Sequence, residues 1–285
     1  MPKAAALLLV LAPVILGQVI LGPTPLHAEG GTPFSPLNAR PATPPTPQTV
    51  ALPVSSAEAP PSLPKGACPV LPGEAAANPG LEHVRASLQP NRRLDILAVG
   101  SGTVLGPEGK HPDDSFSYRM AQQLKAASPQ TTIILTVRGG RGLTAEDMLK
   151  LIDQALSDHP YQLLLWQTGT VEAVRGLPAD AFSRTLAEGA GRAAAAGADL
   201  VLIDPQYSRF LRANTDLDPY EAALARAGAL PGATLFRRFD LMRTWANQGG
   251  IDLERVERAQ RETTANTLHA CLGRALADLV LGHAL

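Results

Sequence analysis

Short apolar segments alternate with helical patterns through the C-terminal two thirds of the chain, and this alternation limits the folds that it can adopt. Residues 96–99 and 163–166 are apolar at every position, which suits strands buried on both faces of a parallel sheet. Residues 131–136 are rich in β-branched side chains, and two further short strands are expected near 200–204 and 234–236.

Helices are expected between and after these strands, at residues 113–127, 144–158, 179–196, 218–228, 240–246 and 265–281. Asp113 or Asp114 is the expected N-cap of the first helix, and Thr144-Ala-Glu-Asp147 resembles a capping box at the start of the second. Strands that alternate with helices predict a parallel sheet covered on both faces. We therefore expect an α/β fold, a three-layer α/β/α sandwich with a five-stranded, mainly parallel sheet.

Proline is concentrated at the N-terminal end of the chain, where 17 of the 26 prolines lie before residue 80. Residues 29–66 combine Pro, Ala, Thr and Ser with few charges and few large apolar side chains. Such a segment cannot bury enough surface to offset its ordering entropy. We expect a disordered or polyproline-like linker there, followed by one globular domain over residues 67–285.

The first residues have the features of an export signal. Lys3 provides a positive charge, residues 4–21 are almost wholly apolar, and Leu26-His27-Ala28 precedes a candidate cleavage site. Residues 1–28 are therefore expected to be a cleaved signal peptide or, because the apolar run is long, an inner-membrane anchor formed by residues 4–26. Both interpretations predict a periplasmic or secreted protein.

The chain has two cysteines, Cys68 and Cys271. An exported chain meets an oxidising compartment, so we expect a disulfide that joins the start of the domain to its last helix. The alternative is a pair of buried free thiols.

Composition and spacing argue against several classes of ligand. A net charge of −1 and an aromatic content of 4% give no support to a nucleic-acid surface. The six histidines show no metal-ligand spacing. Gly100-Ser-Gly-Thr-Val-Leu-Gly106 nearly matches a dinucleotide fingerprint, but its third glycine is one residue late and no acidic residue ends a neighbouring strand at the expected distance. We therefore expect no metal, cofactor or nucleic-acid partner. We also expect a monomer.

Four segments, three at predicted strand ends and one in the last helix, are most informative when they are read together. They are Ile96-Leu-Ala-Val-Gly-Ser-Gly-Thr103, Val137-Arg-Gly-Gly-Arg-Gly142, Leu165-Trp-Gln-Thr-Gly-Thr-Val-Glu172 and Asn266-Thr-Leu-His269. Their order and spacing resemble the SGNH/GDSL hydrolase family over residues 94–285. Trp245-Ala-Asn-Gln-Gly-Gly250 adds to the likeness to bacterial exported members. The resemblance implies a flavodoxin-like sandwich and ester hydrolysis.

The chain departs from this family at the positions that carry its chemistry. The resemblance places Gly102 where the nucleophilic serine belongs and Ser101 at the aspartate before it. Asn266 replaces the aspartate of the catalytic triad, whereas His269 keeps its histidine and Gly139 keeps the oxyanion-hole glycine.

The third segment departs as well. After Gly169 and Thr170, Val171 stands at the oxyanion-hole asparagine and Glu172 at the aspartate beside it. Loss of one oxyanion donor removes on the order of 3–4 kcal/mol of transition-state stabilisation in other hydrolases.

Two interpretations of Ser101 and His269 stay open. In the first, Ser101 is the nucleophile and His269 its base, oriented by Glu172, Glu262 or a backbone carbonyl. In the second, the Ser101 hydroxyl satisfies an amide at a strand end, and His269 is hydrogen-bonded near the sheet edge.

Further residues at the strand ends are candidates to line a substrate pocket. Arg138 and Arg141 could hold an anionic or sugar substrate, or form surface salt bridges. Tyr207 and Ser208 follow the fourth strand and are candidates for the pocket rim, although Tyr207 also suits half-buried packing. His111-Pro-Asp-Asp114 follows the turn after the first strand and could line the cleft, although it favours a solvated loop and helix cap.

Two functions follow from these observations. The first is an exported hydrolase that removes O-acyl esters from envelope or extracellular glycans or lipids. The second is a catalytically degenerate domain that binds an acylated glycan or an envelope partner at the same cleft without turnover.

Overall fold

The computed structural model describes residues 47–55, 63, 68, 80–109, 111–248 and 250–283. The predicted signal peptide or anchor at residues 1–28, and most of the predicted linker, lie outside these residues. Among the described helices, none is both long and apolar enough to cross a membrane.

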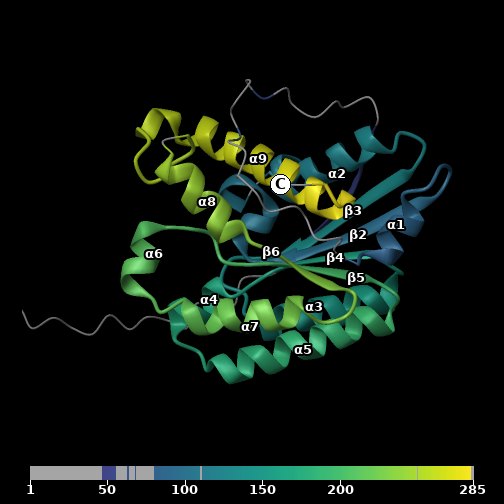
Figure 1. Ribbon diagram of the computed structural model, residues 1–285, viewed down its shortest axis with the longest axis horizontal. Helices are drawn as coiled ribbons and strands as arrows, with labels where there is room; N and C mark the ends of the chain where they lie inside the picture. Colours follow the sequence, from purple (N-terminus) through teal and green to yellow (C-terminus); the bar gives the residue numbers. More distant parts are fainter. Residues whose placement is uncertain are drawn as a thin grey trace, which may run out of the picture. The chain divides into compact units, whose positions relative to one another are not determined.

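One six-stranded sheet forms the centre of the domain (Figure 1). The strands are β1 (Gln48–Pro53), β2 (Arg93–Gly100), β3 (Thr132–Gly139), β4 (Leu163–Gln167), β5 (Asp199–Ile203) and β6 (Ala233–Phe236). They lie in the order β1-β3-β2-β4-β5-β6, and all neighbours are parallel except β1 and β3. The predicted α/β class and the five parallel strands are confirmed.

The sixth strand, β1, corrects the sequence-based expectation. Residues 48–53 fall within the segment that composition assigned to a disordered linker, yet they pair with β3 from Gln48 opposite Gly139 to Pro53 opposite Ile134. Val50 and Leu52 alternate with more exposed residues and are half-buried. Composition alone could not account for backbone hydrogen bonds to an open sheet edge, where a terminal proline is tolerated.

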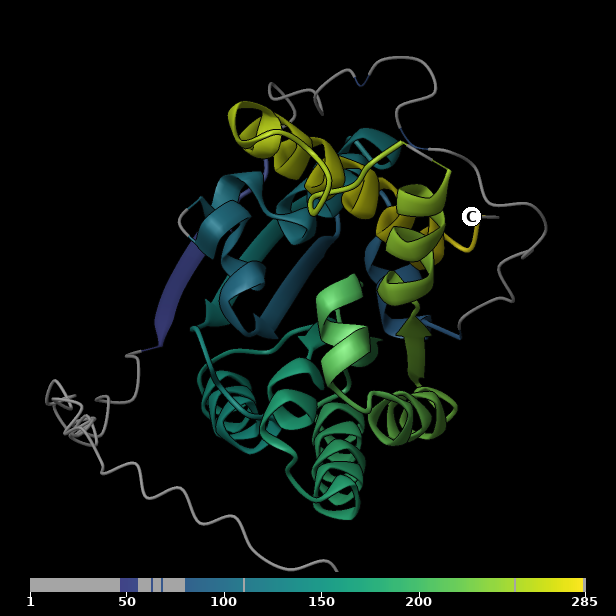
Figure 2. The same ribbon diagram turned by 90° about the vertical axis from the view of Figure 1, so that its left-hand side faces the viewer.

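Helices cover both faces of the sheet, as the two views in Figures 1 and 2 show. One face carries α1 (Glu82–Ser87), α2 (Phe116–Ala127), α8 (Arg238–Asn247) and α9 (Arg261–Leu281). The other carries α3 (Ala145–Asp158), α5 (Ala179–Ala195) and α7 (Asp218–Gly228). The shorter elements are α4 (Thr170–Arg175), α6 (Arg209–Asn214), η1 (Gly102–Leu105), η2 (Pro107–Gly109), η3 (Pro112–Asp114) and η4 (Arg258–Gln260).

The central strands supply both halves of the core because successive side chains point to opposite faces. In β2, Ile96 and Ala98 pack toward α2 and α9, whereas Leu97 and Val99 pack toward α3. This placement explains why the strand is apolar at every position.

Of the two helix caps that the sequence predicted, the cap of α3 is confirmed and the cap of α2 differs. The capping box of α3 is present, with Thr144 and Asp147 each accepting the other's backbone N–H. The N-cap of α2 is Ser115, which accepts from Tyr118 N–H; Asp113 and Asp114 instead belong to η3. A serine hydroxyl at the last non-helical residue reaches this N–H, and the aspartates one and two residues earlier do not.

The last helix begins at Arg261 rather than near residue 265. Its first turn is polar and exposed, so apolar periodicity could not reveal it. This earlier start places Asn266 and His269 inside a continuous helix.

The predicted disulfide is confirmed. Cys68 and Cys271 are joined with a Cα–Cα distance of 5.4 Å across 203 residues of sequence. Cys271 is buried in α9, so the bond fastens Cys68, which lies between β1 and β2 in the sequence, to the core of the domain.

Candidate functional site

A cleft of about 480 Å³ lies at the carboxyl edge of the sheet. Its walls come from the segments that follow β2, β3, β4 and β5, together with Gln48 of β1 and the first residue of α8. The carboxyl ends of parallel strands meet at one edge, which brings these distant segments together. This is where a ligand is expected in an open α/β sheet.

The side-chain amide of Gln167 joins two hydroxyl groups in the cleft. Thr103 Oγ1 donates to Gln167 Oε1 at 3.0 Å, and Gln167 Nε2 donates to Ser101 Oγ at 3.1 Å. Gln167 is the last residue of β4 and is buried, so it fixes both hydroxyls at the ends of paired strands. The Ser101 hydroxyl therefore satisfies an amide at a strand end, here that of a side chain.

Gly102 lines the cleft and has room for a side chain. A Cβ atom built on it would meet only Cα and Cβ of Arg141, both at 3.9 Å, which is ordinary van der Waals contact. Packing therefore does not require glycine at the position of the family's nucleophile.

Gly139 is different, because close packing does require it. A Cβ there would lie 2.5 Å from Val104 Cγ1 and 2.6 Å from the carbonyl oxygen of Gly100. Gly139 is buried between the strand ends, and the neighbouring Gly140 and Gly142 line the cleft in its place.

His269 is buried in α9, with 7% of its surface exposed, and is not among the residues that line the cleft. Its Nδ1 atom accepts the backbone N–H of Phe116, the first residue of α2, at 3.1 Å. Burial, aided by the charges of Arg238 and Arg119, lowers the pKa of His269 to about 4. Since Nδ1 is the acceptor, the proton of the neutral ring is assigned to Nε2.

The predicted orienting groups do not reach this histidine. Asn266 and Glu262 are exposed, and neither forms a hydrogen bond with His269 in the described part of the chain. Both carboxylate oxygens of Glu172 are engaged elsewhere: one accepts from Ala145 N–H and the other from Gly169 N–H at 3.1 Å. Burial raises the pKa of Glu172, and its contacts join the starts of α3 and α4.

Thr170 and Val171 do line the cleft, whereas Gly169 is not among the residues that line it. Gly169 has a φ of +96° and its N–H is bonded to Glu172, so it turns the chain from β4 into α4. This turn directs the first two residues of α4 toward the cleft.

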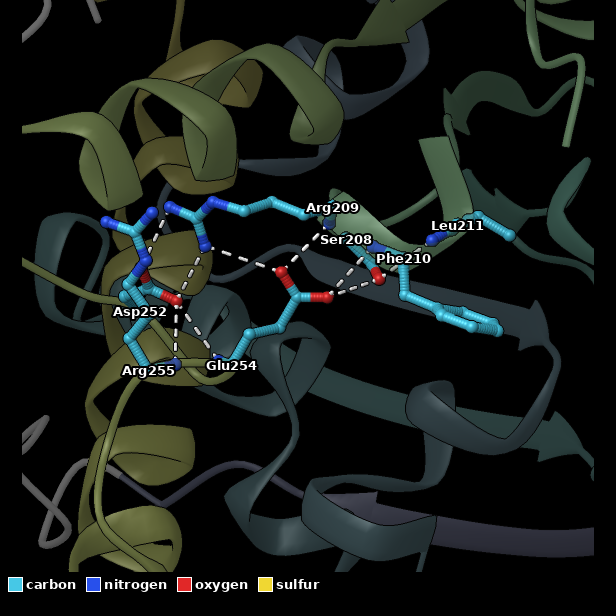
Figure 3. Close-up of polar contacts among 7 residues, drawn as sticks. All are labelled: Ser208, Arg209, Phe210, Leu211, Asp252, Glu254 and Arg255. Carbon is cyan, nitrogen blue, oxygen red and sulfur yellow. Dashed lines mark hydrogen bonds and ion pairs between the residues drawn. The ribbon is translucent and has the colours of Figure 1, made fainter. Parts of the chain in front are cut away.

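Three predicted pocket residues lie elsewhere. The Tyr207 ring packs edge-on against Phe239 with ring centroids 5.3 Å apart. Ser208 caps α6 and donates to Glu254 at 2.6 Å, in a network that includes Arg209 and Asp252 (Figure 3). This network joins α6 to the loop after α8. In the loop after β5, Gln206 lines the cleft in place of Tyr207 and Ser208. The Arg138 side chain, half-buried on β3, points to Asp158 at 3.5 Å, while Arg141 lines the cleft.

Arg238 is the cleft residue that sequence analysis missed. It is the first residue of α8 and only 2% exposed, yet it lines the cleft. Its Nε atom has no hydrogen-bond partner. Burial lowers its pKa to about 10, opposed by the charge of Asp204. The available signal was Arg237-Arg238 directly after a strand, at the ligand-binding edge of the sheet.

Gln167 and Gln48 were also missed, whereas Thr103 belongs to the first strand-end segment that the sequence indicated. Gln167 ends an apolar strand, and a polar residue there marks the carboxyl edge of the sheet. Gln48 could not be found because its strand was not predicted.

A separate group lies on the surface after η2. His111, Asp113 and Asp114 each offer a ligand atom within 4.8 Å of the others, although their sequence spacing did not indicate a metal site. Asp114 is also ion-paired with Arg119 of α2.

Solved structures with a similar fold are esterases and hydrolases. The acetylxylan esterase Axe2 from Geobacillus stearothermophilus matches with a TM-score of 0.52 and 14% identity, covering 68% of this chain and 96% of that chain. LAE5, an α/β hydrolase from the metagenome of Lake Arreo in Spain, matches with a TM-score of 0.52 and 15% identity, covering 68% and 97%. At these identities the likeness concerns the fold.

Comparison of the sequence with protein families gives a match. No curated protein matches the chain significantly. Residues 67–285 match the Non-GDSL lipase-like family, whose name agrees with the altered motif at Gly100–Gly102. The match covers the whole globular domain that the sequence predicted, and the resemblance to SGNH/GDSL hydrolases is confirmed. The chain belongs to the Non-GDSL lipase-like family.

Proposed function

We propose that this protein binds an acylated glycan or lipid in the cleft and does not hydrolyse its ester. One observation carries the proposal: Nδ1 of His269 accepts the N–H of Phe116 inside the core, so the family's catalytic histidine serves as a helix cap. With its proton on Nε2, the neutral imidazole cannot accept the proton of a serine hydroxyl at that atom. It also has no carboxylate that orients the ring, as the aspartate of a catalytic triad does.

The other catalytic positions support the same proposal. Gly102 offers no nucleophile, and Val171 offers no side-chain donor to an oxyanion. Reaction of an ordinary ester in this cleft would therefore lack the nucleophile, the base and one oxyanion donor together.

The cleft keeps the groups that a binding site needs. Ser101, Thr103, Gln167, Thr170 and Gln206 offer hydroxyl and amide groups to the oxygen atoms of a glycan or ester. Leu105 and Val171 provide apolar surface for a short acyl group. Such a mixture of apolar walls with a few placed polar groups is typical of small-ligand sites.

A second candidate function is ester hydrolysis with Ser101 as nucleophile. It is favoured by the position of Ser101 in the cleft, where its oxygen accepts from Gln167 and its own hydrogen has no partner among the described residues. This reaction needs a base, which would require the side chain of His269 to leave Phe116.

Hydrolysis and binding are separated by one set of measurements on the full chain. We expect no turnover of p-nitrophenyl acetate or acetylated xylo-oligosaccharides above the buffer rate, and calorimetric binding of the acetylated oligosaccharides that weakens in Gln167→Ala. Turnover that disappears in Ser101→Ala and His269→Ala would establish the second candidate. Absence of both turnover and binding, for these ligands and for acylated lipids, would contradict the proposal.

We further propose that the protein is exported and acts as a monomer in the periplasm or outside the cell, with residues 1–28 as a signal peptide or residues 4–26 as an anchor. The disulfide between Cys68 and Cys271 supports this proposal, because such bonds persist in oxidising compartments. Cell fractionation followed by non-reducing mass analysis tests it, and a reduced protein found only in the cytoplasm would contradict it.

A further inference from the structure

We propose that the cleft contains a subsite for an oxyanion, a carboxylate or phosphate group on the bound ligand, with Arg238 as its anchor and Arg141 as a second cation. The inference rests on the proposed binding function and specifies the chemistry of the ligand. It assigns tighter binding to an acidic or phosphorylated ligand than to a matched neutral one.

Arg238 is a buried guanidinium without a counter-ion in contact. No aspartate or glutamate oxygen lies within 4.0 Å of it among the described residues, and none of its nitrogens has a described hydrogen bond. A buried charge without partners is strongly unfavourable, so buried arginines are normally ion-paired. The accessible part of the Arg238 side chain lines the cleft.

The acidic group whose charge acts on Arg238 does not balance it. Asp204 follows β5, and its carboxylate accepts the N–H of Phe239 at 2.9 Å, which caps the start of α8. Burial raises the pKa of Asp204 to about 7 despite the attraction of Arg238. Near neutral pH this carboxyl is therefore partly protonated, and Arg238 keeps an excess of positive charge.

The cleft has a second arginine, and no acidic residue is among the described residues that line it. Arg141 is exposed in the turn after β3 and has no ion-pair or hydrogen-bond partner among the described residues. Its Cα and Cβ lie beside Gly102, which also lines the cleft. No aspartate or glutamate is among the described residues that line the cleft, so its charge is positive.

A guanidinium selects planar or tetrahedral oxyanions. Its fork of N–H donors matches carboxylate and phosphate oxygens, and such charge-assisted hydrogen bonds are stronger than neutral ones. In a cleft that also offers hydroxyl and amide groups, this chemistry fits an acidic or phosphorylated sugar.

Matched sugars test the proposal on the full chain. Glucose, glucuronate and glucose 6-phosphate differ in having no anion, a carboxylate or a phosphate, and inorganic phosphate reports the subsite alone. We expect at least one anionic sugar to bind about tenfold or more tighter than glucose, with the advantage decreasing as salt is added. The anionic sugar that binds more tightly identifies whether the subsite prefers a carboxylate or a phosphate.

Single-residue variants test whether Arg238 and Arg141 cause the preference for an anionic sugar. Arg238→Met should remove the preference for the anion, and Arg238→Lys should retain only part of it, because lysine lacks the planar fork. Arg141→Gln should weaken anion binding without a change of fold, which keeps the test valid if Arg238→Met fails to fold. Arg184→Gln, an exposed position on α5 away from the cleft, is the matched control and should have no effect.

The outcomes distinguish the two proposals. Equal binding of the three sugars, or an anion preference that survives in both Arg238→Met and Arg141→Gln, would overturn the oxyanion subsite and leave the proposed function standing. Binding of acetylated xylo-oligosaccharides without any response to glucuronate, glucose 6-phosphate or phosphate would do the same. Absence of binding for every probe would overturn both.

Discussion

The backbone N–H of Phe116 donates to Nδ1 of His269 at 3.1 Å, which makes a side chain of α9 a cap for the first residue of α2. Ser115 accepts the N–H of Tyr118 in the same turn. Two of the N–H groups that every helix leaves unpaired at its start are thus satisfied by buried side chains. The histidine is held by the needs of the fold, independently of catalysis.

Replacement of His269 by phenylalanine should therefore lower stability. The ring shape is roughly kept, but the buried N–H of Phe116 loses its acceptor, which costs about 1–3 kcal/mol. Urea unfolding measures the loss. His83→Phe on the exposed side of α1 is the control and should change stability by less than about 0.5 kcal/mol. An unchanged midpoint for His269→Phe would contradict the capping role.

The same variant should alter the response to acid. The pKa of His269 is about 4 in the folded chain, below its ordinary value of 6.5, so the unfolded chain binds this proton more readily. The histidine thus contributes stability above pH 6.5 that is lost as the pH falls toward 4. The stability difference between wild type and His269→Phe should shrink over that range, and a difference that grows would refute the assignment.

Asp204 should act in the opposite direction. Burial raises its pKa from 3.8 to about 7, so the folded chain holds this proton more tightly than the unfolded chain. Its contribution is fully favourable below pH 3.8 and is lost as the pH rises to 7. Asn keeps an acceptor for Phe239 N–H but does not ionise. The stability of Asp204→Asn relative to wild type should therefore increase from pH 4 to pH 7 and then level off.

Stability measured by urea unfolding across this range checks the prediction for Asp204. Asp180→Asn at the exposed start of α5 is a control, since its carboxylate is not among the charges that shift the pKa of Asp204. A relative stability of Asp204→Asn that falls as the pH rises would contradict the raised pKa.

The fold could be predicted because its signals are local. Residues 96–99 and 163–166 are apolar throughout, and only a sheet covered on both faces buries such strands. Strand β1 escaped prediction because its stability comes from pairing with β3, which lies more than 80 residues away in sequence. Composition measures what a segment can bury and carries no information about an open sheet edge.

The sequence predicted which strand ends form the cleft, but not how the side chains there are oriented. The strand-end argument located Ser101, Gly102, Thr170 and Val171 at the cleft. It could not show that Glu172 turns inward to cap two helices, because a motif gives the position of a residue and not the direction of its side chain. Arg238 was missed since burial of a charged residue is a tertiary property.

The disulfide should contribute a large share of stability. In the chain-entropy model, closing a loop of this length stabilises the fold by about 4–5 kcal/mol. The double variant Cys68→Ser/Cys271→Ser should melt well below the wild type. Reductant should lower the melting temperature of the wild type toward that of the variant and leave the variant unchanged. Equal melting temperatures without reductant would show that the bond adds no stability.

Restoring the nucleophile at Gly102 should not restore hydrolysis. A Cβ at this position meets only Arg141 atoms at 3.9 Å, so Gly102→Ser should fold with stability within about 0.5 kcal/mol of the wild type. The new hydroxyl would still lack a base, because His269 is bonded to Phe116 and buried outside the cleft. We therefore expect no hydrolysis of p-nitrophenyl acetate above the wild-type rate, with Gly102→Ala as the matched control. A rate that rises in Gly102→Ser alone would place a base within reach of the cleft and would overturn the view that this member of the family binds without turnover.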